Sequence, residues 1–251
     1  MGHEDRETAA ARENTRGLLP LAIGFNVLAL VSLVLAIVWG SKYLGGFDWS
    51  VPGQRFNWHP VLMVTGLVLV YGNGALVYRL LRSKPKPQLK LAHAAVNGVA
   101  FLLAIVGSIA VFSFHNQKNI PNLYSLHSWL GLGTMTLFGG NLVGGFAVFL
   151  LPHANDRLRA LVLPLHVFGG SALLSLIAVS IVSGITEKAI FKLNPSGYGQ
   201  LPAEAYVLNF VGTFATLAIL VLAFILSRGE YKRRPLSTEI PIRIAMQEST
   251  H

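Results

Sequence analysis

The sequence predicts an all-α membrane protein, a bundle of six transmembrane helices with both termini in the cytosol. Three observations support this prediction. Hydrophobic residues make up 53% of the 251 residues and charged residues only 12%, compared with about 25% charged residues in soluble domains. Six apolar runs each approach the length of about 20 residues that a helix needs to cross a bilayer. Lysine and arginine are unequally divided between the connections on the two sides.

The six apolar runs define the expected helices, and polar segments rich in turn residues separate them. "RSKPKPQ" divides the second run from the third, "FHNQKNIPN" the third from the fourth, and "PHANDRLR" the fourth from the fifth. Because the runs use most of the chain, we expect one helical domain at 18–234, with disordered cytoplasmic tails at 1–17 and 235–251. The expected helices are residues 18–39, 59–80, 91–112, 126–151, 161–185 and 206–226.

The basic residues indicate how the bundle is oriented. Fifteen of the 20 lysines and arginines fall in the two tails, the second connection and the fourth connection, and five fall on the opposite side. Lysine and arginine concentrate in cytoplasmic loops, so the tails are expected in the cytosol. The net charge of +9 then reflects membrane topology, and we expect no nucleic-acid partner.

Four histidines lie near the starts of four successive predicted helices. Because successive helices alternate in direction, His59 and His127 fall near the non-cytoplasmic face, and His93 and His166 near the cytoplasmic face. Ionisable residues inside membranes are usually functional. We therefore expect two facing histidine pairs, one at each face of the membrane.

Each expected pair suits a haem better than a bare metal ion. Facing side chains of a helical bundle can hold a planar cofactor, and two imidazoles that bind its iron from both sides favour electron transfer. Zinc needs about four ligands, and the absence of cysteine excludes thiolate sites and iron–sulfur clusters. We expect two b haems, one between helices two and four and one between helices three and five. The alternative is a proton or metal-ion transporter without redox chemistry, which predicts acids among the helices that the sequence scarcely has.

Six stretches of the chain resemble the cytochrome b-561 family, including its lysosomal and duodenal animal members. They are "FNWHPVLMVTG", "ALVYRLLR", "NLYSLHSWLG", "GFAVFLLP", "LPLHVFGG" and "SGITEKAIF". The resemblance covers roughly residues 17–235 and implies the same histidine pairing. It implies a di-haem reductase that passes electrons from cytosolic ascorbate to ferric chelate or monodehydroascorbate. It also implies a homodimer in a lysosomal, late endosomal or plasma membrane.

Basic residues near the cytoplasmic histidines are candidate ligands of the electron donor. Lys86 and Lys90 precede His93 by seven and three residues, and Arg159 precedes His166 by seven. In a helix these spacings place the cations on the side of the histidines, where they would attract an anion. The resemblance assigns the three cations to ascorbate. The cytoplasmic side chains expected to contact haem are Arg79, Lys86 and Lys232.

The opposite face carries a second set of candidates. His115 lies in a loop-like segment, and the resemblance implies that His115, Tyr124 and Phe191 border the pocket of the electron acceptor. Residues close to the non-cytoplasmic haem are expected to be Asn122, Leu123, Tyr124, Ser125 and Glu187. No catalytic residue is expected beyond the haems, and no G-x-G-x-x-G motif for a nicotinamide or flavin is present.

Overall fold

The computed structural model describes residues 16–194, 197–236 and 239. Every regular element within these ranges is helical, and six helices are long and apolar enough to cross a membrane. The prediction of an all-helical chain with six spans is therefore confirmed. The sidedness of the termini stays a prediction, and most of both predicted tails lies outside the described residues. The six spans are Leu18–Tyr43, Pro52–Leu80, Lys86–Lys118, Leu126–Leu150, Asp156–Leu193 and Ala203–Ser227.

Three of the spans are continuous α-helices, and three change helical geometry along their length. The continuous spans are α5 (Lys86–Lys118), α7 (Asp156–Leu193) and α8 (Ala203–Ser227). The others, which include π-helical turns, are α2 (Leu18–Val38) with η1 (Trp39–Tyr43), α3 (Pro52–Met63) with η2 (Val64–Val70) and α4 (Tyr71–Leu80), and α6 (Leu126–Gly145) with η3 (Phe146–Leu150). Two short 3₁₀ turns, η5 (Tyr198–Gln200) and η6 (Gly229–Tyr231), flank α8.

Side-chain and backbone caps fix several helix ends. Ser125 and Ser128 form a reciprocal capping box at the start of α6, which satisfies two N–H groups that would otherwise lack partners. Asn155 accepts the N–H of Leu158 at 2.8 Å at the start of α7. Asn119 ends α5 in the left-handed conformation, with φ of 54°, as asparagine often does at helix ends. These local signals set the helix ends independently of hydropathy.

Two helices extend well beyond the apolar runs that predict them. α5 covers 86–118 in place of 91–112, and α7 covers 156–193 in place of 161–185. The 33 residues of α5 span about 50 Å at 1.5 Å per residue, whereas the hydrocarbon layer is about 30 Å thick. His115 therefore lies in the last turn of α5, and the prediction that it lies in a loop was wrong.

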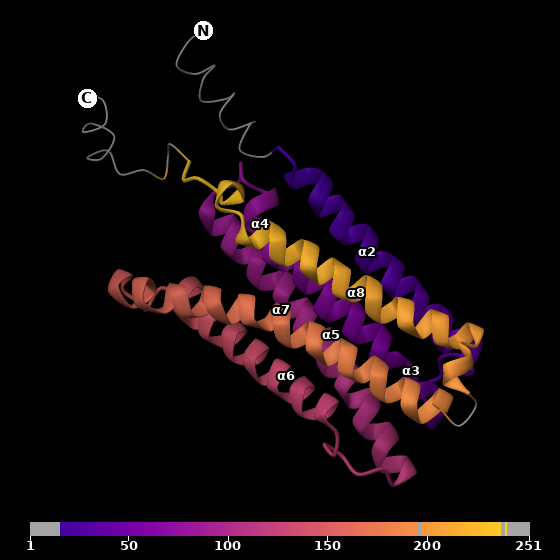
Figure 1. Cartoon of the computed structure of the whole chain (residues 1–251). Helices are drawn as coiled ribbons and strands as arrows, with labels where there is room; N and C mark the ends of the chain where they lie inside the picture. Colours follow the sequence, from indigo (N-terminus) through magenta and orange to yellow (C-terminus); the bar gives the residue numbers. More distant parts are fainter. Residues whose placement is uncertain (1–15, 195–196, 237–238, 240–251) are drawn as a thin grey trace, which may run out of the picture.

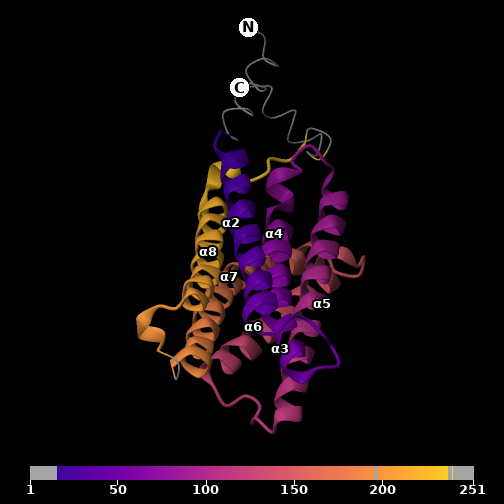
Figure 2. The ribbon, with the colours of Figure 1, turned by 90° about the vertical axis from the view of Figure 1, so that its right-hand side faces the viewer.

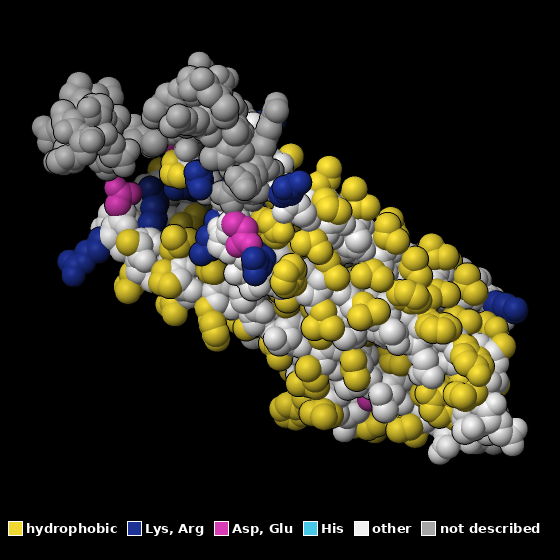
Figure 3. All heavy atoms as spheres, turned by 45° about the horizontal axis from the view of Figure 1, so that its top comes forward, with side chains coloured by type: hydrophobic (Ala, Val, Ile, Leu, Met, Phe, Trp, Pro, Cys, Tyr) yellow, Lys and Arg dark blue, Asp and Glu magenta, His cyan; other side chains and the backbone are white. Residues whose placement is uncertain are grey.

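The helices pack in pairs along the bundle (Figures 1 and 2). α2 packs against α8, α3 against α5, and α6 against α7. Polar groups join some of these helices inside the apolar interior: Ser32 donates to the carbonyl of Val211 at 2.9 Å, and Tyr71 to that of Gly170 at 2.6 Å. Hydrophobic side chains cover the side of the bundle in Figure 3, whereas Lys and Arg gather mainly near one end.

The bundle has two distinct ends. The described residues nearest the two termini lie at the same end (Figure 1), where the hydroxyl of Tyr231 lies 3.4 Å from the carbonyl oxygen of Arg16. We call this the tail end; it also carries the connections at 81–85 and 151–155. The opposite end, with the connections at 44–51 and 119–125, is called the far end.

Candidate functional site

The tail end holds a facing pair of histidines. His93 of α5 and His166 of α7 have ring centroids 6.1 Å apart, with ring planes at 72°. Nδ1 of His93 lies 2.8 Å from the carbonyl oxygen of Gly74, so this nitrogen carries the proton and donates it. Nδ1 of His166 is buried and has no hydrogen-bond partner among the described residues.

The far end holds a second pair with the same spacing. His59 of α3 and His127 of α6 have ring centroids 6.1 Å apart, with planes at 88°. Nδ1 of His59 donates to the carbonyl of Gly107 at 3.0 Å, and Nδ1 of His127 to that of Ser180 at 2.9 Å. His93 precedes Gly107 by 14 residues on α5, so the two pairs lie about 21 Å apart along the bundle.

The centroid separation of 6.1 Å in each pair matches that of two imidazoles that bind one metal ion from opposite sides. A metal–imidazole bond is about 2.0–2.1 Å long, so two rings that bind one ion from opposite sides have centres roughly 6 Å apart. A carbonyl that accepts the Nδ1 proton leaves Nε2 free to bind metal. The described residues contain no group of three or more His, Asp, Glu or Cys side chains placed to hold a metal ion. Two ligands at each site suit haem and fall short of a zinc site.

Two glycines make room for the imidazoles where α6 and α7 meet. A Cβ atom on Gly145 of α6 would lie 2.6 Å from Cε1 of His166, and one on Gly184 of α7 would lie 2.7 Å from Cε1 of His127. Each of the two helices therefore presents bare backbone to the histidine of the other. A larger residue at either position would displace the ring.

A cavity of about 530 Å³ lies beside the tail-end pair, within the size range of small-molecule and cofactor sites. Its wall includes both His93 and His166, and no Asp or Glu is among the described residues that line it. A cavity lined by charges of one sign raises the local concentration of the opposite ion. The cations in the wall are Arg79, Lys86, Lys90 and Arg159.

Backbone carbonyls hold three of these cations. The carbonyls accept hydrogen bonds but do not neutralise the positive charge, so the cavity wall stays cationic. One carboxylate, that of the exposed Asp156, lies 3.5 Å from Arg159. The carbonyl acceptors, at 2.7–3.4 Å, belong to Phe149 for Lys90, Val148 and Leu151 for Arg159, and Leu226 and Arg228 for Arg79.

The far end has a smaller pocket of different chemistry. It measures about 320 Å³, and His127, Glu187 and Phe191 lie in its wall. The rings of Tyr124 and Phe191 stack with their centroids 6.4 Å apart. The ring centroids of His115 and Tyr124 lie 6.3 Å apart. Partial burial and the nearby Glu187 carboxylate raise the pKa of Tyr124, so its phenol stays protonated. The structure thus brings together the three residues expected at the acceptor pocket.

Comparison with known sequences identifies the protein family. The profile of the eukaryotic cytochrome b561 family matches residues 58–192, a range that contains all four paired histidines. The chain belongs to this family.

Curated relatives cover most of the chain. The human (Homo sapiens) lysosomal membrane ascorbate-dependent ferrireductase CYB561A3 is 47% identical over 210 residues, which is 82% of this chain and 87% of that protein. The mouse (Mus musculus) plasma membrane ascorbate-dependent reductase CYBRD1 is 37% identical over 236 residues, 93% of this chain and 81% of that protein. The family implies a b-type haem.

Several residues that were expected to lie close to a haem have other contacts in the structure. Asn122 donates to Asn116 at 2.7 Å, the carbonyl of Leu123 accepts from Trp129 at 2.9 Å, and Ser125 caps α6. These three residues shape the connection between α5 and α6 and do not line the far-end pocket. Lys232 is likewise absent from the wall of the tail-end cavity, so contacts of these four residues with haem stay predictions.

Lys188 is a further candidate functional residue near the far-end pair. In the sequence it is only one of the five basic residues expected on the non-cytoplasmic side. Its Nζ lies 3.9 Å from the centroid of the Phe56 ring, and that ring lies 6.2 Å from the ring of His59. A cation over an aromatic face is electrostatically stabilised. This places one positive charge close to the far-end pair. The sequence signal was its position directly after Glu187 in "SGITEKAIF".

Proposed function

We propose that this protein is a transmembrane ascorbate-dependent reductase that holds two b haems, one in each histidine pair. In this proposal the tail end faces the cytosol, where ascorbate donates one electron at a time. The acceptor at the far end is a ferric chelate or the monodehydroascorbate radical. When bound, each haem iron supplies reversible one-electron chemistry.

The observation that carries the proposal is the repetition of one ligand geometry at both ends of the bundle. Two histidine pairs have the same centroid separation of 6.1 Å and lie about 21 Å apart along the helix axis. The relatives are named as ascorbate-dependent reductases, which supports the donor. The excess of lysine and arginine at the tail end supports its cytosolic side.

The residues of the tail-end cavity have the charge and position to bind the donor. Ascorbate is an anion, and four cations line the cavity beside His93 and His166. Three of these cations are held in place by carbonyl groups, so little side-chain entropy is lost when they bind an anion. We assign Lys86, Lys90 and Arg159 to ascorbate and Arg79 to the haem at this end.

The residues of the far end have a different role. His115, Tyr124 and Phe191 form a row of ring contacts beside the pocket that His127 and Glu187 line. We propose that an acceptor binds against this row. By analogy with the two named relatives, the membrane is lysosomal, late endosomal or plasma membrane, and we further propose a homodimer.

The haem content of purified protein tests this function directly. The wild type is expected to contain two haems per chain and to show a b-type spectrum that ascorbate reduces. His93→Leu and His127→Leu should each retain one haem, because each removes a ligand from a different pair. His153→Leu is the control, since His153 is exposed in the connection after α6; it should retain both haems.

Proteoliposomes distinguish this function from the transport alternative. Vesicles that contain ascorbate and carry the protein should reduce an impermeant ferric chelate outside, in proportion to haem content. A folded protein without haem that moves protons or metal ions across the membrane would overturn the proposal and support the transporter.

A further inference from the structure

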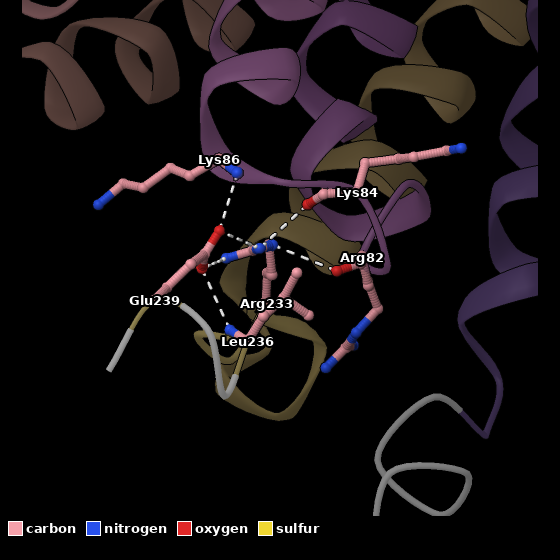
Figure 4. Close-up of polar contacts among 6 residues, drawn as sticks. All are labelled: Arg82, Lys84, Lys86, Arg233, Leu236 and Glu239. Atoms are coloured by element: carbon pink, nitrogen blue, oxygen red, sulfur yellow. Dashed lines mark hydrogen bonds and ion pairs between the residues drawn. The ribbon is translucent and has the colours of Figure 1, made fainter. Parts of the chain in front are cut away.

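The C-terminal segment after α8 packs against the connection between α4 and α5 (Figure 4). There the Arg233 guanidinium binds the Glu239 carboxylate through both terminal nitrogens, at 2.8 Å each. The two side chains are only 9% and 20% exposed. Geometry and burial of this kind distinguish the pair from an ordinary surface ion pair. We call Arg233 and Glu239 the clamp.

Glu239 completes the start of α5. Its Oε1 accepts the backbone N–H of Lys86, the first residue of α5, at 2.8 Å. The N–H groups of a first helical turn have no partner within the helix. Here the N-cap residue is Pro85, whose side chain cannot accept a hydrogen bond, and the first turn contains no acid. A carboxylate at this place also faces the positive end of the helix dipole. α5 thus receives a cap from a residue 153 positions later in the chain.

Arg233 donates hydrogen bonds to backbone carbonyl groups of the connection between α4 and α5. Its Nε donates to the carbonyl of Arg82 at 3.2 Å, and one terminal nitrogen donates to that of Lys84 at 3.0 Å. Arg82 in turn donates to the carbonyl of Lys232 at 3.1 Å. The clamp therefore fixes the backbone from residue 82 to the start of α5 by contacts of both its members.

We propose that the clamp positions Lys86 at the tail-end cavity and thereby sets the affinity of the cavity for its anionic electron donor. Lys86 lines the cavity. Its side chain points away from Arg233 and Glu239 in Figure 4, so the clamp holds its backbone and leaves its ammonium available to a ligand. Arg233 and Glu239 do not line the cavity; they act through Lys86 as positioning residues. The inference rests on the proposed function, which assigns ascorbate to this cavity.

The charge of Glu239 and its place in the clamp have opposite effects on donor binding. As a negative charge near a cationic cavity, Glu239 disfavours an anion, so Glu239→Gln would lower the KM for ascorbate. As part of the clamp, it holds Lys86 in place, so the same substitution would raise the KM. The sign of the change in KM therefore separates the two roles.

Hydrogen exchange at Lys86 tests whether the clamp holds the connection. Because residues 85 and 87 are prolines, Lys86 carries the one backbone amide within 85–87, and exchange there reports on a single hydrogen bond. In full-length haem-loaded protein, Glu239→Gln should accelerate this exchange several-fold, because a neutral amide oxygen accepts the N–H more weakly than a carboxylate and does not form the ion pair with Arg233. Arg233→Gln should do the same, because the carboxylate loses its partner.

Reduction kinetics test whether the clamp acts on the donor. Glu239→Gln and Arg233→Gln should each raise the KM for ascorbate about threefold or more, with unchanged haem content and kcat. The matched control is Glu230→Gln, which removes the same charge from the same segment. Glu230 pairs with Arg228 and makes no contact with residues 82–86 among those that the structure records. The control should leave exchange at Lys86 unchanged and should not raise the KM.

Three results would overturn the inference. They are unchanged exchange at Lys86 in both clamp variants, faster exchange with an unchanged KM, and a lower KM for Glu239→Gln. If ascorbate fails to reduce even the wild type, the proposed function fails, whereas the exchange measurement still decides whether the clamp holds the start of α5.

Discussion

At the tail end, four cations line a cavity of about 530 Å³ beside a histidine pair. At the far end, a pocket of about 320 Å³ beside an equally spaced pair carries a glutamate and adjoins stacked aromatic rings. The ligand geometry is thus common to both ends, and the surroundings differ. Under the proposed function, the histidines hold the haems inside the bundle, and the different side chains around them select the substrate at each end.

The largest expected effect comes from the glycines that face the imidazoles. Gly145→Ala should empty the tail-end site and Gly184→Ala the far-end site, because the added Cβ would lie 2.6 Å and 2.7 Å from the respective rings. Each variant should bind about half the haem of the wild type, as measured by the haem-to-protein ratio.

Gly140→Ala is the control for this prediction, since a Cβ at this position of α6 meets nothing within 4 Å. It should bind as much haem as the wild type. Equal haem loss in all three variants would show that α6 and α7 are sensitive to any added side chain. The result would then give no evidence that the two histidine pairs bind haem in the same way.

A smaller effect is expected when the charges of one end are removed. Replacing both Lys86 and Lys90 with Ala should raise the ascorbate concentration needed for haem reduction several-fold, because a cation near the surface contributes about 0.5–1 kcal/mol. Added salt should reproduce part of the loss. His115→Ala should instead slow reoxidation by an impermeant ferric chelate. Stopped-flow reduction and reoxidation measure the two steps separately, and an exchange of the two phenotypes would reverse the assigned orientation.

A subtler effect should come from the cation near the far-end pair. Lys188→Met should lower the midpoint potential of one haem only, since a nearby positive charge favours the reduced state. A charge that is partly exposed contributes about 0.5–1 kcal/mol, or about 20–40 mV for a one-electron couple. Spectroelectrochemical titration measures this shift. Lys192→Met, one helical turn away and exposed, should shift neither potential by as much.

The smallest expected effect is that of mild acid on the clamp. Hydrogen bonds from Arg233 lower the pKa of Glu239 from 4.5 to about 2. The contribution of a carboxylate with a lowered pKa is fully present above its ordinary pKa and is lost progressively as the pH falls from that value to the lowered one. Protection of the Lys86 amide, corrected for the intrinsic rate, should therefore persist from pH 7 to pH 5. Complete loss of protection by pH 4.5 would mean that Arg233 does not hold the carboxylate.

Much of this architecture could be predicted from the sequence. The six spans follow from apolar length, and the two histidine pairs follow from helices that alternate in direction. The ends of α5 and α7 could not be predicted in this way, because hydropathy locates the apolar part of a helix and not its caps. Asn119 ends α5 after several polar residues, which is why His115 is helical.

Contacts between segments far apart in the chain could not be predicted from the sequence. Lys188 of α7 meets the ring of Phe56 of α3, and no local sequence motif indicates that contact. Arg233 and Glu239 look like ordinary charges of a polar segment in the sequence. Their contact with residues 82–86 becomes visible only when the C-terminal segment and the connection are placed side by side.

The long separation between Glu239 and Lys86 has a consequence for the order of biosynthesis. A ribosome makes the chain from its N-terminus, so the first four helical spans can enter the membrane long before residue 239 exists. The cap of α5 therefore forms only after α8 has been made and its following segment has emerged on the same side of the membrane. The donor cavity reaches its final form as one of the last steps of assembly, and a nascent chain that stops short of residue 239 would insert all six helices without it.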